Sequence, residues 1–335
     1  ETQLQQLGQT LKGEFYFDKT TRILYATDAS AYREMPLAVA LPKTEEDLKK
    51  LIDFARENKT SLIPRTAGTS LAGQVVGNGI VVDVSKYFTQ ILEVNPAENW
   101  VRVQPGVVRD ELNHFLKPHN LFFGPETSTA NRAMIGGMVG NNSCGTHSPI
   151  YNSTREHTLE LKGFLSDGSK VHLKELSEKD FAMKANPLKS VHTQTFEERI
   201  YQMLYFHLHK EETQAEIRKE FPKPEIPRRN TGYGIDFLIN MNVFEPFEDG
   251  ENFNLCKLIC GSEGTLMFIT EIKLNLVPIP PKEIGLLCIH CHSIDESLRA
   301  NIIAMQHQPT ASELMDSYVL ECTKNNREQR KNRFF

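Results

Sequence analysis

The stretch PRTAGTSLAGQ, residues 64–74, combines two glycines, three hydroxyl side chains and one arginine. Gly68 and Gly73 have the separation of the glycines in the phosphate loop of nucleoside triphosphatases, but the lysine that must come next is Gln74. The sequence therefore argues against a protein that hydrolyses ATP or GTP. Glycines still let backbone N–H groups converge on an anion, and hydroxyls add donors. The loop suits a pyrophosphate, which has no γ-phosphate and needs no such lysine.

A second polar stretch, residues 121–154, is rich in glycine, asparagine, serine and threonine and has no clean periodicity. A segment of this kind inside a compact domain is usually functional or disordered, and its apolar residues argue against disorder. GGMVG at 136–140 misses the dinucleotide pattern G-x-G-x-x-G because residue 135 is isoleucine, so an NAD site of that type is disfavoured. Either stretch alone is equally consistent with an ordinary glycine turn, but the two together favour a dinucleotide-like ligand.

The hydrophobic pattern around the first loop predicts a small α/β lobe. The expected elements are a strand at 36–41, a helix within 43–59, and strands at 61–64 and 79–85. Thr44 is the expected N-cap of the helix, with Asp47 as its capping-box partner. Later residues predict a strand around 101–103, a helix around 108–116, and a hairpin over 157–176 with its turn at 166–168.

Composition excludes several classes of protein. The chain has 335 residues, 39% of them hydrophobic and 24% charged, with a net charge of −5. It is therefore not a general nucleic-acid binder. No apolar run approaches the roughly 20 residues that span a bilayer, and no secretion signal begins the chain. Six cysteines are sparse for this length and indicate a reducing, cytoplasmic location, with association at the inner face of a membrane left open.

Five segments occur in the order and spacing of one flavoprotein family: PRTAGTSLAGQ (64–74), VQPGV (103–107), FFGPETST (122–129), IGGMVGNNSCGTHSPIY (135–151) and CGSEGTLMFITE (260–271). They resemble FAD-linked oxidases and dehydrogenases of the vanillyl-alcohol oxidase and p-cresol methylhydroxylase type. Within that family they are similar to the glycolate oxidase, D-lactate and D-2-hydroxyglutarate dehydrogenase branch. GTSLAGQ and GGMVGNNSCG resemble the long bacterial form with a C-terminal iron–sulfur region. The resemblance covers about residues 25–280.

The resemblance implies an α+β fold with a two-lobed FAD-binding domain over residues 1–280. The expected small α/β lobe is about 1–98, and the larger antiparallel-sheet lobe is about 99–280 with an exposed helical insertion at about 180–225. The proline cluster at 278–281 marks a boundary. Residues 281–335 are expected to begin an α/β cap domain, with a strand at 284–292, that is truncated here.

The resemblance also implies which residues bind the cofactor. The first loop would wrap the FAD pyrophosphate through Thr66, Ala67, Gly68, Thr69, Ser70, Gly73 and Gln74. The second stretch would run along the flavin and ribityl chain through Pro125, Thr127, Ser128, Gly136, Gly137, Asn141, Asn142, Ser143, Gly145 and Tyr151. The GSEG turn adds Glu263 and Gly264. Arg132, Asn230 and Tyr233 are candidates for the substrate side of the flavin.

One departure from the family bears on how the cofactor is held. Some relatives attach FAD covalently through a histidine in the first loop, and that position is Thr69 here, so we expect non-covalent FAD. A thioether to Cys144 is conceivable, but a free cysteine is usually a small buried hydrophobe. His147 lies in the flavin stretch, and a turn-capping role is favoured for it over an approach to the active site.

The sequence predicts no metal site. Cys288 and Cys291 of CIHCH would face opposite sides of the expected strand and could not chelate one ion. The chain also lacks the cysteine run of a ferredoxin cluster, so any iron–sulfur cluster would lie in an absent region.

The implied reaction is oxidation of a D-2-hydroxy acid of the lactate, glycolate or 2-hydroxyglutarate type. Hydride would pass to flavin N5, and electrons would pass to an unidentified acceptor outside the chain. The catalytic residues are unknown, because the motifs that supply the base in the resembled enzymes, HAGDGN-like and GEHG-like, are not in these residues. We therefore expect a fragment that binds FAD and turns over poorly.

Two other functions stay open. One is an NADPH-dependent reductase of the same fold, of the UDP-N-acetylenolpyruvoylglucosamine reductase type. The second polar stretch and the cap-like ELMD at 313–316 argue against it. The other is a non-catalytic nucleotide-binding domain, which failure of the folded chain to bind any flavin would favour.

Overall fold

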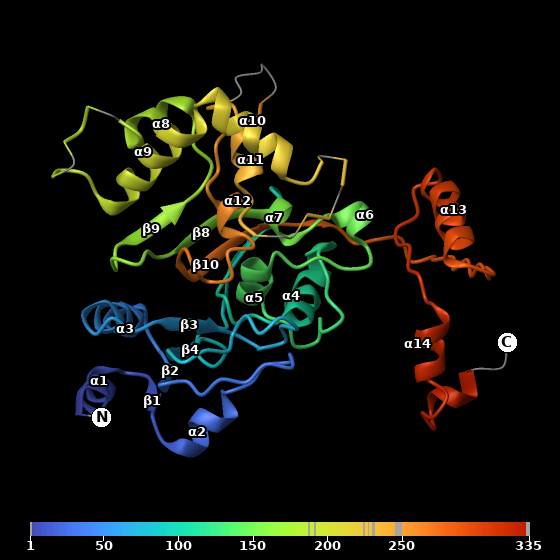
Figure 1. The fold of residues 1–335 in the computed structure, drawn as a ribbon, viewed down its shortest axis with the longest axis horizontal. Helices are drawn as coiled ribbons and strands as arrows, with labels where there is room; N and C mark the ends of the chain where they lie inside the picture. The colour runs from blue at the N-terminus through green and yellow to red at the C-terminus, as the bar shows by residue number, and fades with distance from the viewer. Residues whose placement is uncertain are drawn as a thin grey trace.

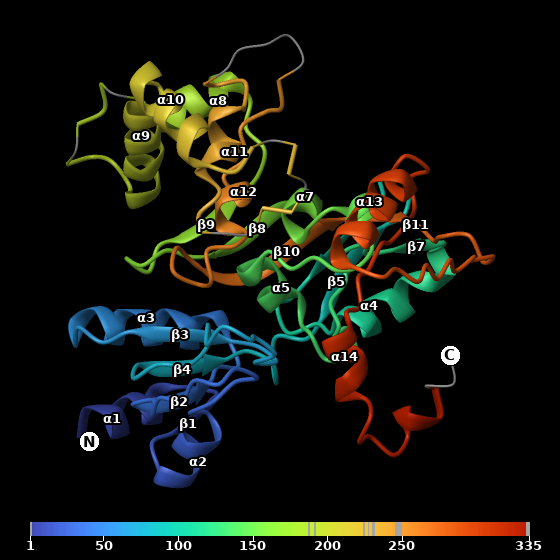
Figure 2. The same ribbon diagram turned by 45° about the vertical axis from the view of Figure 1, so that its right-hand side comes forward.

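The computed structural model describes residues 2–186, 188–190, 192–223, 225–226, 228–229, 232–244 and 250–332. Figure 1 shows a small N-terminal lobe, a larger lobe built from the middle of the chain, and a C-terminal segment that stands apart from both. The two lobes meet along a junction that contains helix α5 (Ile135–Asn141), which lies between strands of the two lobes in both ribbon views (Figures 1 and 2).

The small lobe is a four-stranded sheet in the order β1-β2-β4-β3, with β2, β4 and β3 parallel and β1 antiparallel to β2. Its elements are α1 (Thr2–Thr10), β1 (Glu14–Tyr16), α2 (Lys19–Leu24), β2 (Ala38–Leu41), α3 (Glu45–Glu57), β3 (Leu62–Arg65) and β4 (Ile80–Asp83). Every residue of β2 and β4 is buried, as in parallel sheets covered on both faces. The predicted helix and the three predicted strands of this lobe are therefore confirmed, within two residues at each end.

The N-terminus of α3 is fixed by Asp47, and the predicted capping box with Thr44 is confirmed. The Asp47 side chain is fully buried. Its carboxylate accepts hydrogen bonds from the backbone N–H groups of Lys12 (2.8 Å), Gly13 (3.1 Å), Lys43 (2.9 Å) and Thr44 (3.1 Å). Burial alone would raise the pKa of this carboxyl, but these donors hold it below its usual value. Asp47 thus ties the segment before β1 to the start of α3.

We expect Asp47→Asn to lower the free energy of unfolding by about 2–4 kcal/mol, because an amide NH₂ would face buried N–H donors that now share an ionised carboxylate. Urea unfolding followed by circular dichroism measures this change. The matched variant Asp53→Asn changes a partly exposed carboxylate on the same helix that pairs with Lys49 and Arg56, and it should change stability by about 1 kcal/mol or less. Equal effects of the two substitutions would contradict this role of Asp47.

The larger lobe is a five-stranded antiparallel sheet in the order β5-β6-β10-β8-β9. Its strands are β5 (Ile91–Asn95), β6 (Trp100–Val103), β8 (Thr158–Phe164), β9 (Lys170–Leu173) and β10 (Phe268–Asn275), and a separate two-stranded sheet pairs β7 (Leu121–Phe122) with β11 (Val277–Pro278). The predicted hairpin over 157–176 is confirmed as β8 and β9. Because β5 pairs with β6, the first lobe ends before residue 91 and not at the expected residue 98.

The helical elements of this lobe are α4 (Arg109–Leu116), the 3₁₀ turn η1 (Lys117–His119), α5, α6 (Ser148–Tyr151), α7 (Thr154–His157), α8 (Glu178–Lys184), α9 (Phe196–Leu208), α10 (Glu211–Glu220), α11 (Ile235–Ile239) and α12 (Cys256–Ile259). Of these, α5 packs against β10, and α7 and α12 pack against β8. Phe181, Tyr201 and Ile217 from α8, α9 and α10 are buried in the same cluster as Leu161 of β8. The segment at 180–225 is therefore helical as expected, but it contributes to the core and is not simply an exposed insertion.

The opposite face of this sheet carries a ladder of ion pairs centred on Glu160. Glu160 accepts hydrogen bonds from Lys273 Nζ (2.9 Å), Arg102 Nη2 (3.2 Å) and His172 Nε2 (2.8 Å), and its side chain is only 16% exposed. Desolvation on its own would raise the pKa of Glu160, but these partners lower it to about 2. A carboxyl whose pKa falls on folding stabilises the protein above its unfolded pKa and loses that stabilisation as the pH drops towards the folded value.

We therefore expect the wild-type protein to lose about 2–3 kcal/mol of stability through Glu160 between about pH 5 and pH 2. Urea unfolding at a series of pH values, compared with Glu160→Gln, measures this contribution. The variant should be less stable at neutral pH, and its free energy of unfolding should fall less steeply as the pH drops from about 5 to about 2. Glu93→Gln, at the exposed end of the same ladder, is the control and should keep the wild-type slope. If the stability of Glu160→Gln fell with pH as steeply as that of the wild type, this role of Glu160 would be contradicted.

The C-terminal segment differs from its prediction. Residues 284–292 form no strand, and the elements that follow are α13 (Ile294–Met305), α14 (Ser317–Cys322) and the 3₁₀ turn η2 (Gln329–Asn332). A strand needs a partner for its backbone N–H and C=O groups, and none of the described strands pairs with this stretch. Apolar side chains such as Leu286 (90% exposed) and Leu287 (79% exposed) consequently lie on the surface.

Candidate functional site

The first loop begins where a parallel strand ends. Residues 66–74 follow β3, and Asp83 ends the neighbouring strand β4 at the same edge of the sheet. Ligands of open α/β sheets bind outside the carboxyl ends of parallel strands. Asp83 accepts a hydrogen bond from Tyr25 Oη (2.7 Å), so part of its carboxylate is already used within the protein.

Three motifs that are far apart in sequence meet at the side chain of Gln74. Gln74 Nε2 donates to Asn141 Oδ1 (2.8 Å) at the end of α5 and to Glu263 Oε1 (2.8 Å) in the GSEG turn. Gln74 Oε1 is in contact with Ser70 Oγ across the loop. Both hydrogens of the Gln74 amide are thus used within the protein, and Gln74 links the first loop to α5 and to the GSEG turn.

The same three motifs approach one another so closely that side chains are excluded. A Cβ atom placed on Gly137 of α5 would lie 2.7 Å from Thr66 Oγ1 in the first loop. Gly264 has φ +76°, and a Cβ there would lie 3.0 Å from Cγ of Pro64. The turn is also held to α5, because the Glu263 N–H donates to the Gly140 carbonyl (2.9 Å). The loop, α5 and the turn therefore form one compact unit at the junction of the lobes.

The second polar stretch is more regular than its sequence indicated, because residues 135–141 form helix α5. Gly136, Gly137 and Asn141 lie on this helix. Asn142 follows in the left-handed conformation (φ 49°), and its buried Oδ1 accepts from Ser153 Oγ (2.9 Å) and the Arg155 N–H (2.8 Å). Ser143 Oγ accepts from Asn141 Nδ2 (3.0 Å). Asn142 thus shapes the backbone, whereas Gly137 and Asn141 face the first loop and the turn.

The other cofactor-binding candidates of this stretch have local contacts that do not involve Gln74. Pro125 is buried and its carbonyl accepts from Arg109 Nε (3.2 Å), while Thr127 Oγ1 lies 3.3 Å from Thr129 Oγ1 and Ser128 is exposed. Gly145 packs against Glu126. Tyr151 ends α6 with its ring edge-on to that of Phe122, at 5.1 Å between centroids.

The candidates for the substrate side of the flavin, Arg132, Asn230 and Tyr233, are not brought together by the described contacts. Tyr233 Oη lies 2.7 Å from Thr265 Oγ1, next to the GSEG turn, and its side chain is 44% exposed. Arg132 is exposed and donates to its neighbour Asn131 (3.4 Å), and no described contact joins it to Tyr233. Asn230 lies outside the described residues.

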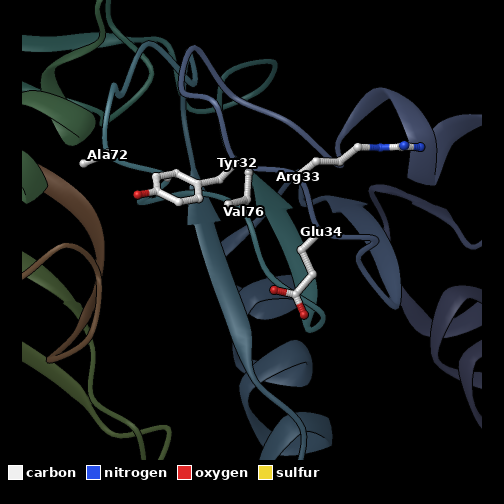
Figure 3. A pocket seen from close by; sticks show the side chains of 6 residues that line it. Tyr32, Arg33, Glu34, Ala72 and Val76 are labelled. Atoms are coloured by element: carbon white, nitrogen blue, oxygen red, sulfur yellow. The ribbon is translucent and has the colours of Figure 1, made fainter.

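A hollow of about 260 Å³ opens beside the first loop, lined by Tyr32, Arg33, Glu34, Ala72, Gly73 and Val76. Figure 3 shows the Tyr32 ring and Val76 turned towards Ala72, whereas the Arg33 and Glu34 side chains point away. Sites for drug-sized ligands are commonly about 300–1,000 Å³, so this hollow is too small for a whole dinucleotide. Tyr32 has no recognisable motif around it, and sequence reasoning did not find it.

Sequence reasoning also missed Arg155, whose side chain is 2% exposed. Its guanidinium donates to the carbonyls of Cys260 (2.8 Å), Lys257 (2.9 Å) and Arg229 (3.4 Å) and lies 4.5 Å from the centre of the Phe237 ring. Burial lowers the pKa of this guanidinium. Arg155 thus anchors the chain that enters the GSEG turn, and no local pattern in the sequence signals the role.

Within the described ranges, no cluster of three potential metal ligands occurs, and no helix is long and apolar enough to cross a membrane. Cys256 and Cys260 are buried, and burial raises the pKa of both thiols, that of Cys260 to about 11. Both thiols are therefore protonated near neutral pH and inert as metal ligands.

Residues 36–174 match the family model described as FAD binding domain. The matched residues include the first loop and the whole of the second polar stretch, so two of the motifs that meet at Gln74 lie inside this domain. Residues 36–174 therefore belong to this family of FAD-binding domains.

Curated relatives match over a longer range. The chain is 38% identical over 319 residues to a D-2-hydroxyglutarate dehydrogenase of Haemophilus influenzae and 34% identical over 325 residues to one of Escherichia coli; the alignments cover 94% and 95% of this chain and 30% of each relative. It is 24% identical to a glycolate oxidase subunit GlcD of Bacillus subtilis, over 94% of this chain and 53% of that protein. The chain thus spans about 30% of the length of the dehydrogenases that it resembles.

Among solved structures, an alkyldihydroxyacetonephosphate synthase has the same fold, with a TM-score of 0.50 at 16% identity over 79% of this chain and 38% of that one. The predicted α+β, two-lobed FAD-binding fold is therefore confirmed, and so is the predicted resemblance to FAD-linked oxidases and dehydrogenases.

The residues of the junction fit FAD on two counts. The backbone of α5 at Gly137 is exposed and carries no side chain, so a ligand can approach it beside Thr66, where a Cβ would lie 2.7 Å from Thr66 Oγ1. The hydroxyls of Thr66 and Thr69, together with the loop backbone, form a donor set suited to an anion, whereas the Ser70 hydroxyl donates to Gln74 Oε1. The Glu263 carboxylate would repel a phosphate, but Gln74 stands between it and the loop through two hydrogen bonds.

Proposed function

We propose that this chain is the FAD-binding part of a dehydrogenase that oxidises a D-2-hydroxy acid, with D-2-hydroxyglutarate as the first candidate substrate. The observation that carries the proposal is the meeting of the first loop, α5 and the GSEG turn at Gln74. Relatives that are 34% and 38% identical are named for oxidation of this hydroxy acid, and they match nearly the whole chain. When bound, FAD supplies the hydride acceptor that such an oxidation requires.

Each part of the junction then has its own role. The loop backbone and the hydroxyls of Thr66 and Thr69 bind the pyrophosphate, Ser70 supports the loop through Gln74, and Gly68 and Gly73 let the loop turn around the ligand. Gly137 keeps α5 close to the loop without blocking it. Gln74 and Glu263 hold the two lobes together at this point. Pro125, Thr127, Gly145 and Tyr151 line the flavin end, with Tyr233 on the substrate side.

We infer further that FAD is bound without a covalent bond, because Thr69 occupies the position where some related enzymes carry the histidine that attaches the cofactor. Denaturation in acid should release all flavin into the supernatant. Flavin that precipitates with the protein would contradict this assignment. Electrons are expected to leave for an acceptor outside these residues, and an iron–sulfur centre is the candidate that the resemblance suggests.

The substrate is tested on the longer protein in which these residues occur. D-2-hydroxyglutarate should reduce an artificial electron acceptor at least tenfold faster than L-2-hydroxyglutarate, with D-lactate and glycolate as the competing substrates. The 335-residue chain alone should bind FAD but give little turnover. Rapid bleaching of bound flavin by NADPH would contradict the proposal and favour a reductase.

A further inference from the structure

A carboxylate and an imidazole form a closely bonded pair in the second polar stretch. The backbone N–H of His147 donates to Glu126 Oε1 (3.1 Å), and ring atom Nδ1 of the same histidine lies 2.5 Å from the same oxygen. The Glu126 side chain is 26% exposed and that of His147 is 42% exposed. One carboxylate oxygen therefore fixes both the backbone and the ring of residue 147.

The backbone around this pair is shaped to hold it. A Cβ on Gly145 would lie 2.3 Å from Glu126 Cγ and 2.8 Å from the Glu126 carbonyl oxygen, so any larger residue would displace the carboxylate. On the other side, the His147 ring centre lies 6.4 Å from that of Tyr151. Burial and the negative charge of Glu126 raise the pKa of the Tyr151 hydroxyl, so the phenol stays protonated beside the pair. Gly145 and Tyr151 are both assigned to the flavin end of the site.

The pair determines the chemical state of the imidazole. An ionised carboxylate only accepts hydrogen bonds, so Nδ1 must carry the hydrogen and donate to Glu126. In the neutral ring Nε2 then bears the lone pair and is an acceptor. The protein thus presents an oriented nitrogen acceptor on a partly exposed side chain.

We propose that His147, oriented by Glu126, binds the flavin half of FAD by accepting a hydrogen bond at Nε2. The donor is a ribityl hydroxyl or the N–H of the isoalloxazine ring, both of which belong to riboflavin and neither to the adenosine half. His147 is a binding residue, and Glu126 is a positioning residue that acts through it. The inference rests on the proposed function, because it requires FAD at this junction.

Chemical footprinting tests the contact on the unaltered chain. Diethylpyrocarbonate acylates unprotonated imidazole nitrogens, and mass spectrometry reports the rate at each histidine. Saturating FAD should slow modification of His147 at least fivefold, and FMN should slow it similarly, whereas ADP should leave it unchanged. His207, exposed on α9 and well separated from α6 (Figure 1), is the internal control and should react at one rate throughout.

The result separates failure of this inference from failure of the proposed function. A chain that binds FAD, as its visible spectrum shows, yet leaves His147 fully reactive overturns the role of His147 alone. Protection by ADP but not by FMN would also overturn it, because it would place His147 at the adenosine half. A folded chain that binds no FAD contradicts the proposed function, and the inference falls with it.

Substitutions then test the positioning role of Glu126. His147→Leu and Glu126→Ala should each weaken FAD binding about fivefold to tenfold, and the double variant should be no weaker than either one, since both remove the same hydrogen bond. Glu126→Gln retains an amide oxygen that can accept from Nδ1 and should restore most of the affinity. If the fold losses of FAD affinity multiplied in the double variant, or if Glu126→Gln bound FAD as weakly as Glu126→Ala, the coupling between Glu126 and His147 would be contradicted. Circular dichroism confirms that each variant is folded.

Discussion

Replacement of Arg155 by methionine is expected to lower the free energy of unfolding by about 3–5 kcal/mol. The guanidinium is nearly fully buried and donates to three carbonyls on two segments that are remote in sequence, Arg229 on one and Lys257 and Cys260 on the other. Methionine fills much of the volume but leaves those acceptors without their donors. Because the Cys260 carbonyl precedes the GSEG turn, FAD affinity should fall along with stability.

Arg155→Lys should recover only part of this loss, because one ammonium group cannot reach carbonyls that a planar, forked guanidinium spans. Arg56→Met is the matched control. Its side chain is 52% exposed and donates to the Asp167 carbonyl at the surface, so its loss should cost about 1 kcal/mol or less. Urea unfolding measures all three variants. If Arg155→Met unfolded at the wild-type midpoint, the buried guanidinium would not hold the turn.

Gly137→Leu is expected to reduce FAD affinity by at least 100-fold while the protein stays folded. The leucine side chain would enter the space between α5 and the first loop, where a Cβ alone already meets Thr66 Oγ1 at 2.7 Å. Leucine is a far better helix former than glycine, and residue 137 is exposed, so α5 itself should tolerate the change. Binding should therefore be lost through obstruction and not through unfolding.

Fluorescence titration with FAD, together with thermal unfolding monitored by circular dichroism, separates the two effects. Gly285→Leu is the control, because nothing lies within 4 Å of a Cβ at that position. It should bind FAD like the wild type. Wild-type affinity in Gly137→Leu would mean that FAD does not lie between α5 and the loop.

Local patterns made much of the fold predictable. The capping box of Thr44 and Asp47 spans four residues, and the buried strands β2 and β4 are short apolar runs, so both could be predicted from the local sequence. The strand expected at 284–292 was wrong, because its apolar pattern is local whereas a strand depends on a partner. Helix α5 was not foreseen, because a glycine-rich helix has low intrinsic propensity and is stabilised here by packing at the junction of the lobes.

The candidate site was likewise predictable only in part. The residue types of the first loop pointed to a pyrophosphate, and the resemblance supplied the other motifs. Nothing in the sequence showed that Gln74 binds Asn141 and Glu263, which lie 67 and 189 residues away. Arg155, Glu126 and Tyr32 were missed because each acts through contacts that exist only in the folded chain.

The visible absorption spectrum of the purified chain, followed by identification of whatever acid releases, tests the central claim most directly. We expect a flavin spectrum and free FAD in the acid supernatant, which would show that the loop at 64–74 belongs to a site for a non-covalently bound dinucleotide. A folded chain that stays colourless and takes up no added FAD would contradict it.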